Sequence, residues 1–111
     1  MLIAHHGGLP GIRDPSLLDP ALARPVNIFN YGDPDLPALA ATYAAGIIGN
    51  HPFIDGNKRT GFVAAATFLD RNGLELTAAE AQATQITIDL AAGDISEDGY
   101  AAWLRDNALP F

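Results

Sequence analysis

The sequence predicts an all-α fold, and three observations lead to this prediction. Apolar residues recur at helical spacing in four long segments, each bounded by residues that start or stop helices. Alternation of apolar and polar residues, which is typical of strands, is almost absent. No internal repeat or low-complexity tract suggests another architecture.

The first third of the chain, residues 2–35, is rich in Gly, Pro, Asn and Asp, which favour turns and loops. We expect one short helix there, from about Pro15 to Ala23, capped by Asp14 or Ser16 and ended by Pro25. The segment from Val26 to Tyr31 is then predicted as a small extended hairpin or flap, or as a plain connecting loop.

Two longer helices are predicted in the middle of the chain. Between Asp35 and Asn50, leucine, alanine, tyrosine and isoleucine side chains recur at helical spacing, with alanines that suit close packing. A second helix is expected from about Asn57 to Asn72, with Gly73 at the usual stop position. The connection between them is short and contains Pro and Gly.

The last third is predicted to form two more helices. Thr77 and Glu80 have capping-box spacing, so a helix should run from there to about Ala92 and end at Gly93. Ser96 begins a final amphipathic helix. Its cluster of Tyr100, Trp103 and Leu104 is expected to lie in the core.

Composition limits the kinds of function. The 111 residues are enough for one domain, which we expect to span residues 1–111, and 49% of them are hydrophobic. The absence of cysteine excludes disulfides and thiolate metal sites. A net charge of −7 argues against direct binding to nucleic acid or to anionic membranes. With no signal segment or long apolar run, a cytoplasmic protein is predicted.

The segment His51 to Gly61, HPFIDGNKRTG, combines groups that suit phosphoryl chemistry. Free amides at the start of the following helix favour an anion, so Gly56, Asn57, Lys58 and Arg59 would cradle phosphate. Asp55 would supply an oxygen ligand for Mg²⁺. His51 would be the general base, because an unperturbed histidine titrates near neutral pH. The only lysine of the chain, Lys58, stands beside Arg59.

These residues resemble the signature of the Fic/Doc, or Fido, family, and the segments GGLPGIRD and ALARP resemble the region before it in death-on-curing toxins. The resemblance implies a compact Fido-type helical bundle with a small flap before the motif. It also implies that Phe53 anchors the site in the core. Such proteins commonly carry more helix before the position of Met1, so a shortened N-terminus is expected.

Two branches of the family differ in chemistry. The adenylylating Fic branch has Gly where Lys58 stands and a second Arg where Phe62 stands, whereas the Doc branch has Lys at the former position. Resemblance therefore implies a toxin kinase that moves the γ-phosphoryl of ATP, with Mg²⁺, to a Thr or Ser of a translation factor, with elongation factor Tu as the family's example. Gly56 is the Fic-like choice, so transfer of a nucleotidyl group is the alternative.

A non-catalytic binding module is a third hypothesis. A toxin also implies an antitoxin whose disordered tail folds as a helix into an apolar groove. Taken singly, His51 could be a loop histidine, Asp55 a helix cap, and Lys58 with Arg59 an exposed pair. His5 and His6 are interpreted as solvated residues and not as a metal site. For Arg13 we favour a structural ion pair over nucleotide contact.

Overall fold

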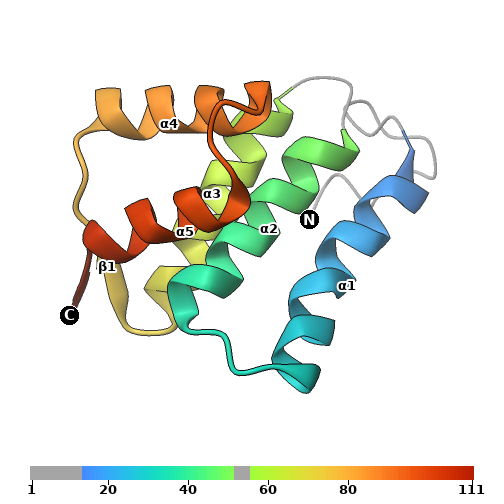
Figure 1. Ribbon diagram of the computed structural model, residues 1–111, viewed down its shortest axis with the longest axis horizontal. Coiled ribbons are helices and arrows are strands. Elements are labelled where there is room, and N and C mark those ends of the chain that lie inside the picture. Colours follow the sequence, from blue (N-terminus) through green and yellow to red (C-terminus); the bar gives the residue numbers. More distant parts are fainter. Residues whose placement is uncertain (1–13, 52–55) are drawn as a thin grey trace.

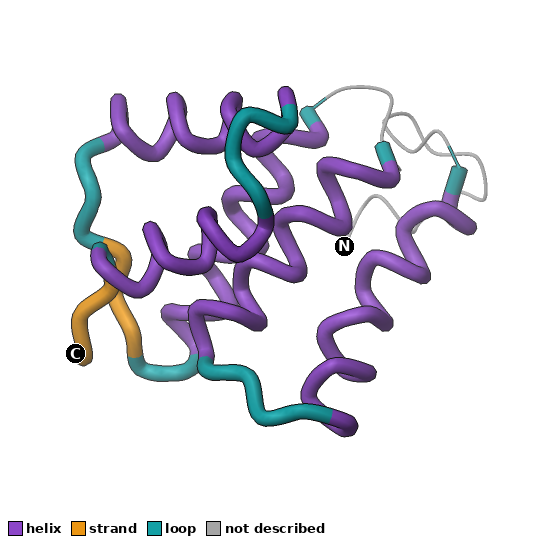
Figure 2. Tube along the Cα trace, viewed as in Figure 1, coloured by secondary structure: helices purple, strands orange, loops and turns teal. Residues whose placement is uncertain are grey.

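A computed structural model describes residues 14–51 and 56–111 and confirms the all-α prediction. Five helices form the bundle: α1 (Pro15–Tyr31), α2 (Leu36–Asn50), α3 (Asn57–Arg71), α4 (Glu80–Ala92) and α5 (Glu97–Asp106). Two short strands, β1 (Leu74–Leu76) and β2 (Ala108–Pro110), pair antiparallel with Leu74 opposite Pro110. Figure 1 shows α2 in the middle of the bundle and α1 at its edge, and Figure 2 shows how little of the chain is strand.

Helix α2 is central because its residues are small. It contacts all four other helices, and Ala40, Ala41 and Ala44 are completely buried. Two glycines mark the closest approaches. A Cβ at Gly46 would lie 3.3 Å from Ala21 of α1, and a Cβ at Gly61 of α3 would lie 3.1 Å from the carbonyl oxygen of Ala44. Helices that pack this closely hold their ends in fixed relative positions.

The predicted aromatic anchor of the last helix is confirmed. Tyr100 is fully buried, and its ring stacks on Trp103 with the centroids 6.0 Å apart. Burial raises the pKa of the Tyr100 phenol, an effect that the nearby Thr87 hydroxyl partly opposes. The Thr87 hydroxyl donates instead to the Ala83 carbonyl at 2.7 Å, and the Tyr100 hydroxyl makes no hydrogen bond with correct geometry in the described part of the chain.

Most predicted helix ends are confirmed. Asp14 accepts a hydrogen bond from the amide of Ser16, Asp35 from that of Ala38, and Ser96 from that of Gly99, each at 3.0 Å. Gly73 and Gly93 have φ values of 85° and 81°, the left-handed conformation in which glycine ends helices without strain.

The prediction that Pro25 ends the first helix is wrong, and so is the extended flap from Val26 to Tyr31. Helix α1 continues to Tyr31 with Pro20 and Pro25 inside it. Each interior proline loses a backbone hydrogen bond, a local cost that packing can offset. Pro25 is buried, and the preceding Arg24 pairs with Glu97 of α5, so tertiary contacts hold both sides of the proline in the helix.

The predicted capping box at Thr77 is also wrong. Helix α4 begins at Glu80, and its N-cap residue, Ala79, has no side-chain hydrogen bond. Thr77 binds the C-terminal segment instead: its amide and its hydroxyl donate to the carbonyl oxygen of Asn107, at 2.8 and 3.0 Å. The strands next to this contact were not predicted, because three residues are too few for a pattern to appear.

Among the described residues, two ion pairs connect elements that are distant in sequence. Arg24 makes a two-pronged contact with Glu97, which also accepts a hydrogen bond from the buried Thr42 hydroxyl at 3.1 Å. Arg105 of α5 contacts both carboxylate oxygens of Asp35, at 2.7 and 3.0 Å.

None of the helices within residues 14–51 and 56–111 is long and apolar enough to cross a membrane.

The Asp35–Arg105 ion pair makes the free energy of unfolding depend on pH in the acidic range. The hydrogen bond from Arg105 holds the pKa of Asp35 below its usual value near 3.8, so the pair stabilises the fold above that pH and is lost as pH falls below it. Asp35→Asn keeps the helix cap but removes the ion pair. We expect it to lower stability by about 0.2 to 1 kcal/mol at pH 7, since the pair is half-exposed, and by progressively less as pH falls through the lowered pKa of Asp35. Thermal unfolding from pH 2 to 7 measures this, and a loss that stays constant with pH would contradict it.

Candidate active site

The predicted site lies where the chain leaves α2 and enters α3. His51 follows the last residue of α2, and Gly56 precedes the first residue of α3 (Figure 1). Residues 52–55 lie outside the described residues, and with them the predicted metal ligand Asp55 and the predicted anchor Phe53. His5, His6 and Arg13 lie outside them as well. Five of the predicted site residues can therefore be placed: His51, Gly56, Asn57, Lys58 and Arg59.

His51 has an unusual backbone conformation. Its φ and ψ are 49° and 53°, and it is the only residue other than glycine with a positive φ in the described ranges. The left-handed region costs an ordinary residue roughly 1–2 kcal/mol, which the surrounding structure must supply. Its amide still donates to the Ile47 carbonyl at 3.2 Å, so α2 ends at this residue and the chain turns.

The end of α2 is fixed to α1. The Asn50 side-chain amide donates to the Leu17 carbonyl at 3.0 Å, and the contact is partly buried. The side chain of the next residue, His51, is exposed to solvent. A histidine at the end of a fixed helix and open to solvent can meet a group presented by another molecule, as a general base must.

The start of α3 has features that favour an anion. Gly56 is the N-cap residue with φ 77°, and a Cβ there would meet nothing within 4 Å, so the backbone angle and not crowding is the reason for glycine at this position. Because glycine has no side chain, the N-cap residue makes no side-chain hydrogen bond to the helix. The first turn of α3 contains no acidic residue. The positive end of the helix dipole therefore favours a negative group at this position.

Lys58 and Arg59 place two positive charges at this helix start. Both side chains are exposed, whereas Arg24 and Arg105 are held in ion pairs. Within the part of the chain that the structure describes, neither Lys58 nor Arg59 forms an ion pair. Cations at a helix N-terminus oppose the dipole, and a bound phosphate would remove that repulsion.

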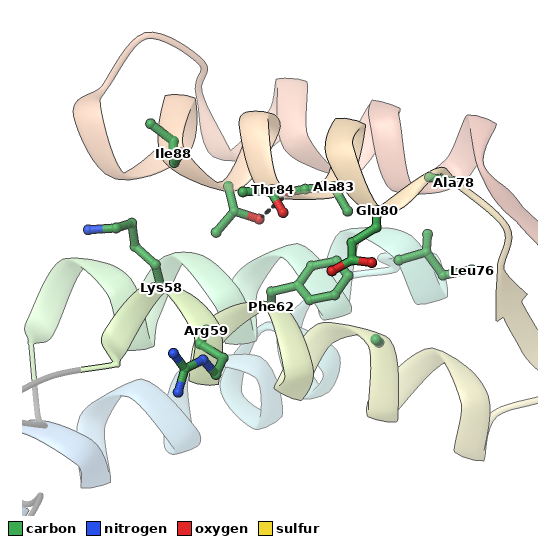
Figure 3. A pocket seen from close by; sticks show the side chains of 11 residues that line it. Lys58, Arg59, Phe62, Leu76, Ala78, Glu80, Ala83, Thr84 and Ile88 are labelled. Carbon is green, nitrogen blue, oxygen red and sulfur yellow. Dashed lines mark hydrogen bonds between the residues drawn. The ribbon is translucent and has the colours of Figure 1, made fainter.

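A cavity of about 770 Å³ begins at these two cations and runs between α3 and α4. Figure 3 shows Lys58 and Arg59 at one end of it and Glu80 toward the other, above the ring of Phe62. Most of the wall is apolar, and the α4 side also includes Thr84 and Thr87. Sequence reasoning missed this wall, although Thr84, Thr87 and Ile88 have the i, i+3, i+4 spacing of one helix face.

The described residues support metal binding less than they support phosphate binding. Residues 14–51 and 56–111 contain no group of three or more His, Asp or Glu side chains arranged to hold a metal ion. The only carboxylate of the motif, Asp55, lies outside these residues. A single carboxylate with substrate phosphates is a common way to hold Mg²⁺, so the role of Asp55 stays a prediction.

Comparison with known proteins agrees with the motif. The profile of the Fic/DOC family matches residues 1–69, which include the whole segment from His51 to Gly61. The protein named Protein kinase doc from Escherichia phage P1 is 36% identical over 104 residues, which cover 93% of this chain and 82% of that protein. Toxin Doc from Mycolicibacterium smegmatis is 40% identical over 103 residues, which cover 88% of this chain and 78% of that protein. With its motif at the junction of α2 and α3 in a helical bundle, this chain belongs to the Fic/Doc family.

Proposed function

We propose that the protein is a Doc-like toxin that transfers the γ-phosphoryl group of ATP to a Thr or Ser hydroxyl of another protein. The observation that carries the proposal is the start of α3, where Gly56 at the N-cap and the exposed cations Lys58 and Arg59 form a cationic helix N-terminus in the motif that begins at His51. The names of the two relatives, one a kinase and both Doc proteins, support the same activity.

The proposed step uses the chain's own groups in distinct roles. His51 takes the proton from the substrate hydroxyl, whose oxygen attacks the γ-phosphorus, and the bond to the β–γ bridging oxygen breaks to release ADP. The amides of Asn57, Lys58 and Arg59, with the two cationic side chains, stabilise the charge on the phosphate oxygens. Mg²⁺ held by Asp55 would neutralise further phosphate charge, and Phe53 would anchor the turn that carries Asp55.

The cavity between α3 and α4 fits the partner that a toxin requires. An antitoxin tail that folds as an amphipathic helix would pack its apolar face against Phe62, Ala83 and Ile88. An acidic residue on that helix would pair with Lys58 or Arg59 and block phosphate binding. We therefore propose that inhibition acts in trans through this groove.

The substrate is proposed to be a translation factor, with elongation factor Tu as the first candidate. The toxin would then act in the cytoplasm as a single domain. Its acidic character suits a protein target better than a nucleic acid or an anionic membrane, because a net charge of −7 repels both of these.

The deciding experiment is a transfer assay with elongation factor Tu and with whole-cell extract, using ATP labelled at the α or the γ phosphate. We expect protein label from γ-labelled ATP alone, with a loss of about 10²-fold or more in Lys58→Ala, because it removes charge stabilisation. Arg71→Ala, an exposed cation at the other end of α3, is the matched control and should retain activity.

The other outcomes separate the alternatives. Label from α-labelled ATP would assign the protein to nucleotidyl transfer, for which Gly56 is the observation in favour. Absence of label from either position, in the extract as well as with the purified factor, would favour a non-catalytic module.

A further inference from the structure

The outer face of α1 is apolar and exposed. Leu22, Val26 and Phe29 lie at i, i+4 and i+7, which is one stripe of the helix, and they are 42%, 52% and 64% exposed. They are three of the seven large hydrophobic side chains that are exposed in the described residues. Such a stripe is typical of a surface that packs against another helix.

A hole lies directly beside this stripe. It has a volume of about 260 Å³, with Val26 and Phe29 on its rim, Leu36, Leu39 and Tyr43 of α2 on one side and Phe68 of α3 on another. The Tyr43 and Phe68 rings contact each other with centroids 5.3 Å apart, so part of the wall is aromatic. A cavity of about 150 Å³ accepts benzene in a protein, so this hole is large enough for a phenylalanine ring.

We infer that this face of α1 binds a second copy of the same chain around a two-fold axis. An exposed ring, Phe29, and a hole that fits a ring stand side by side, which is the self-complementarity that a two-fold interface needs. With the axis between Val26 and Phe29, the Phe29 ring of each copy enters the hole of the other, and the two α1 helices pack antiparallel.

Charge favours this face over the rest of the surface. The chain has 13 acidic residues and a net charge of −7, so two copies repel each other over most orientations. Residues 20–32 contain no acidic residue, and their one charge, Arg24, is paired with Glu97.

The dimer is expected to be weak. A helix of 17 residues is about 25 Å long, and one helix face with an adjoining hole makes an interface below about 1,200 Å² in total, the range of transient contacts. We expect a Kd of about 10 to 100 µM. Figure 1 shows α1 on the other side of α2 from α4, so the dimer leaves the α3–α4 groove open.

The test is sedimentation of the full chain from about 5 to 500 µM, at 50 and 500 mM NaCl. We expect the mass to rise from 11.7 kDa toward twice that value, and Kd to fall a few-fold at high salt because salt screens the repulsion. Val26→Ser and Phe29→Ser should abolish association. Val63→Ser removes an equally exposed valine on α3, 51% against 52%, and should leave Kd unchanged.

A cross-linking measurement identifies the face independently. Since the chain has no cysteine, Val26→Cys and Val63→Cys each carry a single thiol. A short bis-maleimide should link Val26→Cys into a covalent dimer at 100 µM, and Val63→Cys should remain monomeric. A monomer at 500 µM in both salts overturns the inference, as does equal cross-linking of the two variants. None of these readouts requires transfer activity, so the result is independent of the proposed function.

Discussion

Replacing His51 by asparagine will lower the rate of phosphoryl transfer by about 10² to 10⁴, the usual span for loss of a general base. Asparagine cannot take the substrate proton at neutral pH, but it tolerates the left-handed conformation that His51 adopts at φ 49°. Alanine would add backbone strain to the chemical loss, so the backbone angle makes asparagine the better variant. Initial rates with γ-labelled ATP measure the effect.

Binding of ATP separates the chemical role from a structural one. His51 is not among the proposed phosphate ligands, so His51→Asn should bind ATP within about two-fold of the wild type by calorimetry, whereas Lys58→Ala should bind it more weakly. Melting temperature should change little in both variants, because both side chains are exposed. A His51→Asn variant with transfer above about one-tenth of the wild-type rate would exclude the general-base role.

The sequence predicted those elements whose signals are local. Asp35, Ser96, Gly73 and Gly93 act within one turn of a helix end, and each holds the position expected of it. The motif at the start of α3 is local too, since its amides, Gly56 and the two cations are consecutive. Local chemistry of this kind depends little on the rest of the fold.

The errors arose where distant contacts decided the structure. A proline usually ends a helix when only the local sequence is considered. Here α1 continues through Pro25 because Arg24 binds Glu97, 73 residues away, and because Pro25 is buried. Thr77 has capping-box spacing, but its hydroxyl binds Asn107, 30 residues further on. The α4 wall of the cavity likewise reaches Lys58 only through the packing of α3 and α4. No window of sequence contains both partners of such a contact.

The close packing of α2 and α3 leads to the second large effect, at Gly61. A Cβ there would stand 2.8 Å from Cγ1 of the buried Ile48 and 3.1 Å from the carbonyl oxygen of Ala44. The isoleucine has little room to move and the carbonyl belongs to the α2 backbone, so any side chain separates the helices. We expect Gly61→Leu to destabilise the protein by about 3 kcal/mol or more, measured by urea unfolding.

Gly49→Ala is the matched control on the neighbouring helix. A Cβ at Gly49 meets nothing within 4 Å, so alanine there should stabilise the fold by about 0.4 to 1 kcal/mol through helix propensity. A Gly61→Leu variant as stable as the wild type would show that α2 and α3 are not in close contact at this position.

Gly61→Ala connects this packing to the chemistry. Its smaller side chain should cost about 1–3 kcal/mol, partly offset by helix propensity, so the variant should remain folded at 25 °C. The same shift moves the start of α3 relative to His51, which is fixed to the end of α2. A displacement of about 1 Å between base and phosphate site can cost 10²-fold in rate. We therefore expect folded Gly61→Ala to lose far more transfer activity than stability, whereas equal activity in Gly61→Ala and Gly49→Ala would mean that the two helix ends act without a fixed separation.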